Sequence, residues 1–285
     1  MAKISFGVSP AYHISRYSDR FTPEDVAASL ADLAGMGFSA FQLEVFHPET
    51  LNDWVNRGNL VVANMVEKTG VLPSQFVGHF LLHGFGSAEA LKSDFGIPET
   101  KACVALLKPF PDCETITVAL PVFSAPKGVN TEMYQMLWGR FTEKLETMIA
   151  IAEDAGKRIA LEIMPGSILG GLQGLVRLIN ITDSPALGYN FDTGHAWASR
   201  EAIELLPGML ADRIFGTHLK DNCQVENLAM VPGRGTIPWD AVINNLRSVD
   251  YPGSWDLEIR SEGANIKADY AEGLAFIKSK LNQEK

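Results

Sequence analysis

The chain has 285 residues, of which 46% are hydrophobic, enough for a large folded core and against general disorder. Its formal net charge of −10 repels polyanions and argues against nucleic acid as the main partner. Three cysteines without CxxC spacing, no signal-like stretch and no apolar run of about 18 residues predict a reduced, cytoplasmic protein outside the membrane.

Strand-like and helical patterns alternate along the whole chain. Apolar and β-branched runs predict eight strands, at 4–8, 38–46, 75–82, 114–120, 158–164, 186–191, 213–219 and 254–259. Helical periodicity follows at 22–37, 47–68, 87–107, 131–155, 170–179, 200–210, 238–249 and 266–281. The segment between the first strand and the first helix, with Tyr12, His13 and Tyr17, is predicted to be a loop.

Eight such units favour parallel strands with helical crossovers, because parallel neighbours need long connections. Units of about 35 residues match a single (β/α)₈ TIM barrel over residues 1–285. An open doubly wound sheet is the structural alternative. It often has a glycine-rich first turn, whereas this chain has Ser9-Pro10-Ala11 there.

Four polar side chains stand at the ends of the last four predicted strands: Glu162, Asp192, His218 and Glu258. In a TIM barrel these ends face one mouth, so the side chains can converge on one point. Three carboxylates and one imidazole suit Mn²⁺, Mg²⁺ or Co²⁺, with Zn²⁺ also compatible. A cation would also relieve the mutual repulsion of the carboxylates.

Each of these residues also has a simpler structural explanation. These explanations are an ion pair of Glu162 with Lys220, a satisfied core position for His218, a helix cap for Asp192, and an ion pair of Glu258 with Arg260. The coincidence of all four at successive strand ends favours a functional site over four separate structural roles.

Several motifs together resemble the xylose-isomerase-like TIM-barrel superfamily. They are Leu161-Glu162, Asp192-Thr193-Gly194-His195, His218-Leu219-Lys220-Asp221, Pro232-Gly233-Arg234-Gly235 and Leu257-Glu258-Ile259. Within the superfamily, the chain is most similar to sugar phosphate isomerases and epimerases, such as ketose 3-epimerases and inosose-processing enzymes. This resemblance implies a sugar or sugar phosphate as the small-molecule partner.

The resemblance also implies roles for individual residues. Glu162, Asp192, His218 and Glu258 would ligate one divalent metal ion, with Mn²⁺ favoured, and Glu162 and Glu258 would be the acid/base pair. His195 and Arg234 would hold substrate oxygens. The metal would stabilise a cis-enediolate while the two glutamates move a proton between the faces of the sugar.

The N-terminal half is expected to supply the walls of the substrate site. Glu44, His79 and His83 stand at predicted strand ends, and Trp197 is expected to line the mouth, as is His13.

The segment Val231-Pro232-Gly233-Arg234-Gly235 offers no metal ligands, which argues against the three-metal endonucleases of the superfamily. Met164-Pro165-Gly166 departs from the pattern of many ketose epimerases and leaves isomerase, epimerase and keto-polyol dehydratase open. A non-catalytic barrel that binds a sugar or a metal is the alternative from another class. The sequence is compatible with a homo-oligomer.

Overall fold

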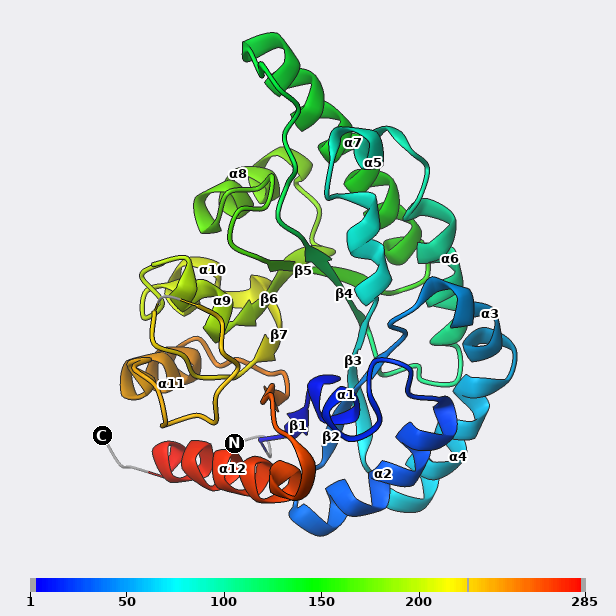
Figure 1. Cartoon of the computed structure of the whole chain (residues 1–285), viewed down its shortest axis with the longest axis vertical. Coiled ribbons are helices and arrows are strands. Elements are labelled where there is room, and N and C mark those ends of the chain that lie inside the picture. Colours follow the sequence, from blue (N-terminus) through cyan, green and yellow to red (C-terminus); the bar gives the residue numbers. More distant parts are fainter. Residues whose placement is uncertain (1–3, 225, 283–285) are drawn as a thin grey trace.

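The computed structural model describes residues 4–224 and 226–282 and shows a ring of parallel strands surrounded by helices (Figure 1). The strands within these residues are β1 (Phe6–Val8), β2 (Ala40–Glu44), β3 (Leu72–Val77), β4 (Thr115–Leu120), β5 (Arg158–Ile163), β6 (Leu187–Asp192), β7 (Ile214–His218) and β8 (Trp255–Leu257). Strands β2 to β7 pair in chain order in one parallel sheet, and β1 pairs with β8 in a second.

Backbone hydrogen bonds join the two sheets at both seams. The Ser39 N–H donates to the Phe6 carbonyl over 2.9 Å, and the Leu219 N–H donates to the Asp256 carbonyl over 2.8 Å. The predicted TIM barrel is therefore confirmed.

Helices cover the outside of the strands, except for the first helix, which lies at the mouth of the ring (Figure 1). They are α1 (Ala11–Tyr17), α2 (Pro23–Met36), α3 (Leu51–Asp53), α4 (Asn59–Thr69), α5 (Ala88–Lys92), α6 (Ile97–Leu106), α7 (Thr131–Asp154), α8 (Leu172–Thr182), α9 (Thr193–Ala198), α10 (Leu206–Leu210), α11 (Trp239–Ser248) and α12 (Ile266–Leu281). Short 3₁₀ turns stand at η1 (Pro48–Thr50), η3 (His79–Gly84), η4 (Ala211–Arg213) and η5 (Gly263–Asn265), and η2 (Trp54–Gly58) is a π-helical turn. In the described part of the chain, no helix combines the length and apolar character that a membrane crossing needs.

The start of α2 illustrates how local sequence sets an element boundary. The Thr22 hydroxyl accepts from the Asp25 N–H over 3.2 Å, and the Asp25 carboxylate accepts from the Thr22 N–H over 2.8 Å. This capping box and Pro23 in the first turn satisfy or remove donors that the helix leaves unpaired. Gly37 then ends the helix at a φ of 86°, a left-handed conformation that glycine adopts without strain.

Three element predictions were wrong in ways that affect the site. The predicted loop after β1 is helix α1, which buries His13, and the His13 Nε2 lies 2.9 Å from the Ser29 hydroxyl. His13 therefore does not line the mouth. Strand β3 ends at Val77 rather than at residue 82, and the chain turns at Gly78 into η3. The turn brings Leu81 so close to Gly78 that a side chain at residue 78 would clash with it.

The third difference follows strand β6. Helix α9 begins at Thr193, directly after the strand, whereas the helical pattern predicted a start near residue 200. Asp192 caps this helix, so the motif from Asp192 to His195 is a strand end joined to a first helical turn.

Candidate metal centre

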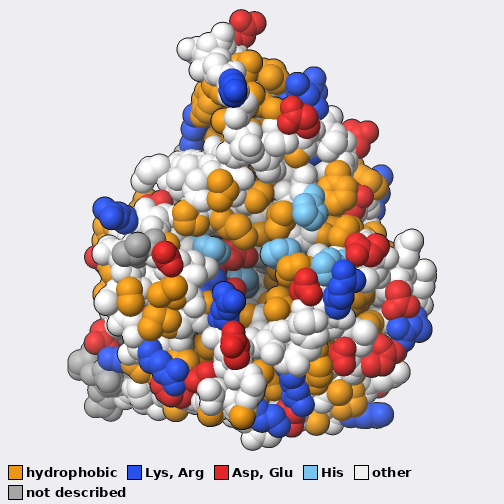
Figure 2. Space-filling view, in the orientation of Figure 1, with side chains coloured by type: hydrophobic (Ala, Val, Ile, Leu, Met, Phe, Trp, Pro, Cys, Tyr) orange, Lys and Arg blue, Asp and Glu red, His pale blue; other side chains and the backbone are white. Residues whose placement is uncertain are grey.

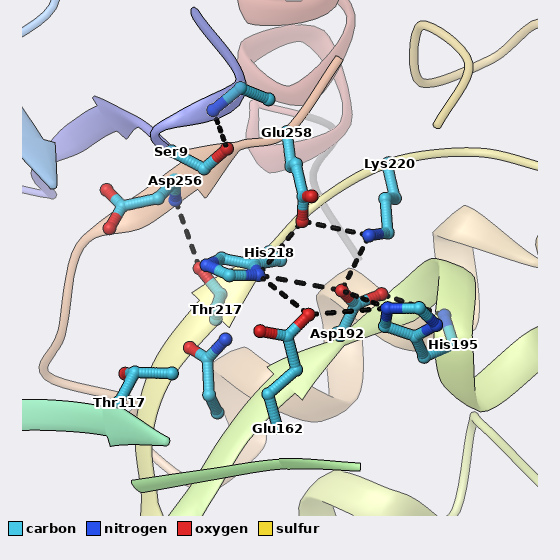
Figure 3. A network of polar contacts seen from close by, with 12 residues as sticks. Ser9, Thr117, Glu162, Asp192, His195, Thr217, His218, Lys220, Asp256 and Glu258 are labelled. Atoms are coloured by element: carbon cyan, nitrogen blue, oxygen red, sulfur yellow. Dashed lines mark hydrogen bonds and ion pairs between the residues drawn. The ribbon is translucent and has the colours of Figure 1, made fainter. Parts of the chain in front are cut away.

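The four predicted metal ligands converge at one end of the barrel. Glu162 is near the end of β5, Asp192 and His218 are the last residues of β6 and β7, and Glu258 directly follows β8. Asp192 and His218 are register partners in neighbouring strands. One ligand atom from each of the four residues lies within 4.8 Å of all the others, and Figure 3 shows the side chains pointing toward one another.

The imidazole of His218 lies at the centre of the cluster. Its Nδ1 is 2.9 Å from Glu258 Oε2, 3.4 Å from Glu162 Oε1 and 3.5 Å from Asp192 Oδ2. Among the described residues, this buried Nδ1 has no hydrogen-bond partner. Buried polar atoms normally find such partners, so an unpartnered imidazole nitrogen beside three carboxylates is consistent with a cation site.

The donor set fits a divalent cation. Metal–ligand bonds of about 2.0–2.3 Å place ligand atoms at most about 4.5 Å apart, so the observed cluster needs only a few tenths of an ångström of contraction. Side-chain exposure is 0% for Asp192, 3% for His218, 7% for Glu162 and 21% for Glu258, so the more exposed Glu258 leaves the cluster accessible from the mouth.

Lys220 is part of this cluster and was not predicted as a site residue. Its Nζ lies 2.7 Å from Asp192 Oδ2 and 2.9 Å from Glu258 Oε2, and its side chain is 1% exposed. The sequence does carry a signal for it, since residues two apart on an extended segment share a face and Lys220 follows His218 by two. Glu258 therefore pairs with Lys220, whereas the structural alternative placed it with Arg260.

The buried charged groups of the cluster strongly shift one another's pKa values. Burial alone would lower the pKa of His218, but the nearby Glu258 and Glu162 carboxylates raise it well above its ordinary value. Burial would raise the pKa of Glu162, but His218 and His195 bring it well below its ordinary value. Burial would also raise the pKa of Glu258, but Lys220 and His218 lower it to about 2.

His195 stands beside the cluster on the first turn of α9. Its backbone N–H donates to Asp192 Oδ1 over 2.8 Å, which leaves Asp192 Oδ2 facing the cluster. Asp192 is thus both the helix cap and a candidate ligand. The His195 ring reaches Glu162, with Nε2 3.4 Å from Oε1.

A cavity of about 280 Å³ opens over the cluster, and Figure 2 shows a hollow with histidine and acidic side chains in this face. The predicted wall residues Glu44 and His79 line it together with Phe46, whose ring stacks on His79 at a centroid distance of 4.2 Å. Apolar side chains complete the wall; they include Ile14, Val77 and Met164. Glu44 Oε2 is buried and has no hydrogen-bond partner among the described residues.

Burial raises the pKa of the Glu44 carboxyl well above its ordinary value. The shift favours the protonated form of this carboxyl, which can donate a hydrogen bond into the cavity.

Two other predicted substrate contacts lie outside the residues that line this cavity. His83 is in η3, with its ring 6.3 Å from the ring of Phe95. Trp197 is on α9 and donates from Nε1 to the Thr236 hydroxyl over 3.1 Å. Their contact with a substrate stays a prediction.

Arg234 is also held away from the cavity lining. Its guanidinium donates to both carboxylate oxygens of Glu272 over 2.9 and 2.6 Å and lies 2.9 Å from Asp269. Both acids are on α12, and the Arg234 side chain is 47% exposed. In this arrangement the guanidinium faces the outer helix layer rather than the four ligands.

The motif resemblance, the closed barrel and the convergent ligand cluster agree with a comparison against known families. The model of the xylose isomerase-like TIM barrel matches residues 30–280. The chain belongs to this family. The resemblance predicted from the strand-end motifs is therefore confirmed.

Several curated relatives of this chain are inosose dehydratases. An inosose dehydratase from Bacillus thuringiensis is 29% identical over 145 residues, which cover 45% of this chain and 48% of the relative. The chain thus matches about half the length of this curated relative.

Among solved structures, 3-keto-D-glucoside 4-epimerase from E. coli has a TM-score of 0.76 at 18% identity, covering 97% of this chain and 100% of the other. The IOLI protein with a bound zinc atom has a TM-score of 0.73 at 17% identity, covering 98% and 96%. These likenesses show the shared fold.

Proposed function

We propose that the protein is a divalent-metal-dependent isomerase or epimerase that acts on a ketose or keto-polyol. The observation that carries this proposal is the convergence of Glu162, Asp192, His218 and Glu258 beneath a cavity at the mouth of the barrel. The cavity volume of about 280 Å³ is at the small end of ligand sites, which favours a monosaccharide-sized substrate. The dehydratase and epimerase among the relatives support the reaction class.

The four side chains would hold one divalent ion, and their oxygen-rich set favours Mn²⁺, with Mg²⁺, Co²⁺ and Zn²⁺ also compatible. When bound, the ion would polarise the substrate carbonyl and stabilise the enediolate that forms when the neighbouring C–H loses its proton. The carboxylate of Asp192 and the imidazole of His218 would serve only as ligands.

Glu162 and Glu258 would be the acid/base pair. They come from β5 and from the end of β8, and Nδ1 of His218 lies between them, 3.4 and 2.9 Å from their nearer oxygens. One carboxylate would take the proton from carbon, and the other would return a proton to the opposite face. The lowered pKa values of both groups keep them ionised at neutral pH, ready to act as bases. Glu258, with 21% of its side chain exposed, would take up from solvent the proton that it returns, and the Lys220 ammonium 2.9 Å from its Oε2 would stabilise its ionised form.

The remaining predicted residues would hold the substrate. The Glu44 carboxyl would form a hydrogen bond with a substrate oxygen, and His79 and His195, which also line the cavity, would bind substrate hydroxyl groups. We expect alanine replacement of His83, Trp197 or Arg234, which stand outside the cavity lining, to change KM more than kcat.

A dehydratase acting on a keto-polyol is the second candidate. Removal of the same proton followed by loss of a hydroxyl group would need an acid beside the leaving oxygen. The glutamate that has taken the proton from carbon would pass it to the leaving hydroxyl group, so that water departs. The inosose dehydratases among the relatives favour this candidate.

Solvent deuterium distinguishes these candidates. The metal-loaded protein is incubated in D₂O with ketoses, inososes and their phosphates, and products are followed by NMR. Incorporation with inverted configuration identifies an epimerase, incorporation with carbonyl migration an isomerase, and loss of water a dehydratase. Binding of a sugar without any exchange would instead support the non-catalytic barrel. Glu162→Gln is the matched control, because it preserves the shape of the side chain and removes the base.

A further inference from the structure

A layer of buried polar side chains lies directly beneath the ligand cluster. Gln42 is on β2, two residues before Glu44, and is fully buried inside the barrel. Its Oε1 lies 2.9 Å from Nε2 of His218, the ring nitrogen that faces away from the other three ligands. This contact connects Gln42 to the metal centre through one of its four candidate ligands.

Two acceptors fix the orientation of the Gln42 amide. Its Nε2 lies 2.8 Å from Asp256 Oδ2 and 3.3 Å from the backbone carbonyl oxygen of Thr217. A carbonyl oxygen can only accept, so the NH₂ end must stand here whether or not Asp256 carries a proton. The carbonyl end of Gln42 therefore faces His218.

This orientation fixes the tautomer of His218. Because Gln42 Oε1 is only an acceptor, His218 Nε2 must carry the hydrogen and donate it. In the neutral ring the lone pair is then on Nδ1, the atom that lies 2.9 Å from Glu258 and points into the ligand cluster. The hydrogen bond also holds the plane of the ring.

Asp256 in turn is firmly anchored. Its carboxylate accepts from the Ser74 hydroxyl over 2.7 Å and the Ser254 hydroxyl over 2.5 Å, in addition to Gln42. Gly7 is its register partner on β1, and any side chain there would clash with the carboxylate. Figure 3 shows Asp256 and Thr217 on the other side of His218 from Asp192 and Lys220.

We infer that Gln42 is a positioning residue for the metal centre, held by Asp256 and presenting His218 to the ion through Nδ1. The inference rests on the proposed metal function. Gln42 belongs to none of the sequence motifs and is not among the residues that line the cavity; it reaches the site only through His218. Outer partners of this kind typically contribute about 10- to 100-fold to metal affinity.

The test compares the affinity of the chelator-treated protein for Mn²⁺ and Zn²⁺, by competition with a chromogenic chelator, among three variants. Gln42→Met keeps the volume and removes the acceptor, so its Kd is expected to rise about 10- to 100-fold. Gln42→Glu keeps an acceptor opposite His218 Nε2 but loses the donor to Asp256 and Thr217, so its Kd should fall between those of Gln42→Met and the wild type. Gln75→Met is the matched control, since Gln75 is equally buried but bonds Asn190 and Thr117, which are not ligands.

Unchanged affinity in Gln42→Met, or an equal loss in Gln75→Met, would overturn the positioning role while leaving the metal centre intact. A wild-type protein that binds neither ion would overturn the proposed metal function itself, and the inference with it. If the Gln42 variants do not fold, nitrogen-15 NMR of the zinc-loaded wild type decides: a protonated Nε2 on His218 supports the inference, and a protonated Nδ1 refutes it.

Discussion

Replacement of Lys220 by methionine tests the electrostatics of the cluster. This ammonium lies 2.7 Å from Asp192 and 2.9 Å from Glu258, with 1% of its side chain exposed. Removal of one partner from a buried charge pair costs about 3–5 kcal/mol, because the remaining charges lose their compensation. A bound divalent ion supplies positive charge to the same carboxylates, so it should offset most of this loss.

The expected change in Tm follows from the size of the chain. An unfolding entropy of about 2.1 cal/mol/K per residue gives roughly 600 cal/mol/K for 285 residues. A loss of about 3–5 kcal/mol then lowers Tm by roughly 5–8 °C in the metal-free variant. With saturating Mn²⁺ or Zn²⁺, the gap to the wild type should shrink to less than half of that.

Thermal unfolding is monitored by circular dichroism, first with chelator and then with metal, and gives the Tm difference between variant and wild type under both conditions. Lys144→Met is the matched control, because this buried lysine donates to the carbonyl oxygens of Gly84, Ala90 and Phe95 and faces no ligand. Its destabilisation should be the same with and without metal. If Lys220→Met lowered Tm equally with and without metal, the idea that Lys220 and the metal ion neutralise the same carboxylates would be refuted.

Three further predictions concern catalysis and pH. Glu162→Gln and Glu258→Gln should each reduce turnover by at least roughly 10³-fold with an unchanged circular dichroism spectrum, whereas wild-type rates in the double variant would contradict the pairing. Because the pKa of His218 is raised, metal binding should release a proton and strengthen as pH rises, which calorimetry in buffers of different ionisation enthalpy measures; a heat independent of the buffer would argue otherwise. Burial lowers the pKa of His13 from 6.5 to about 3. The contribution of the neutral His13 ring to folding stability is therefore fully present above pH 6.5 and is lost as pH falls toward 3. Urea unfolding at pH 7 and 4.5 should therefore show the wild type losing roughly 2–3 kcal/mol more than His13→Gln, and equal losses would contradict the burial argument.

The barrel and the ligand cluster could be predicted because both follow from strand ends. Apolar runs locate buried parallel strands, and the carboxyl ends of these strands share one mouth. The convergence could therefore be predicted without knowledge of side-chain contacts for Glu162, Asp192, His218 and Glu258. Asp192 also shows that a structural role and a site role can coincide, since one oxygen caps α9 and the other faces the cluster.

Other side chains depend on packing that a linear pattern does not contain. Arg234 has a long, flexible side chain, and two acids of α12 determine its direction in the structure. His83 is placed by the turn at Gly78, which ends β3 early. Lys220 and Gln42 share the inward face of their strands with ligands or wall residues, but their roles rest on partners more than 25 residues away in the chain.

The most direct measurement of the proposed centre is the metal content and affinity of the purified protein after chelator treatment and reloading. The convergent ligands predict about one divalent ion per chain, with the affinity largely lost in His218→Ala and in Asp192→Ala while both variants remain folded. A wild-type protein that takes up no divalent ion, or variants that bind it as tightly as the wild type, would contradict a metal centre at this site.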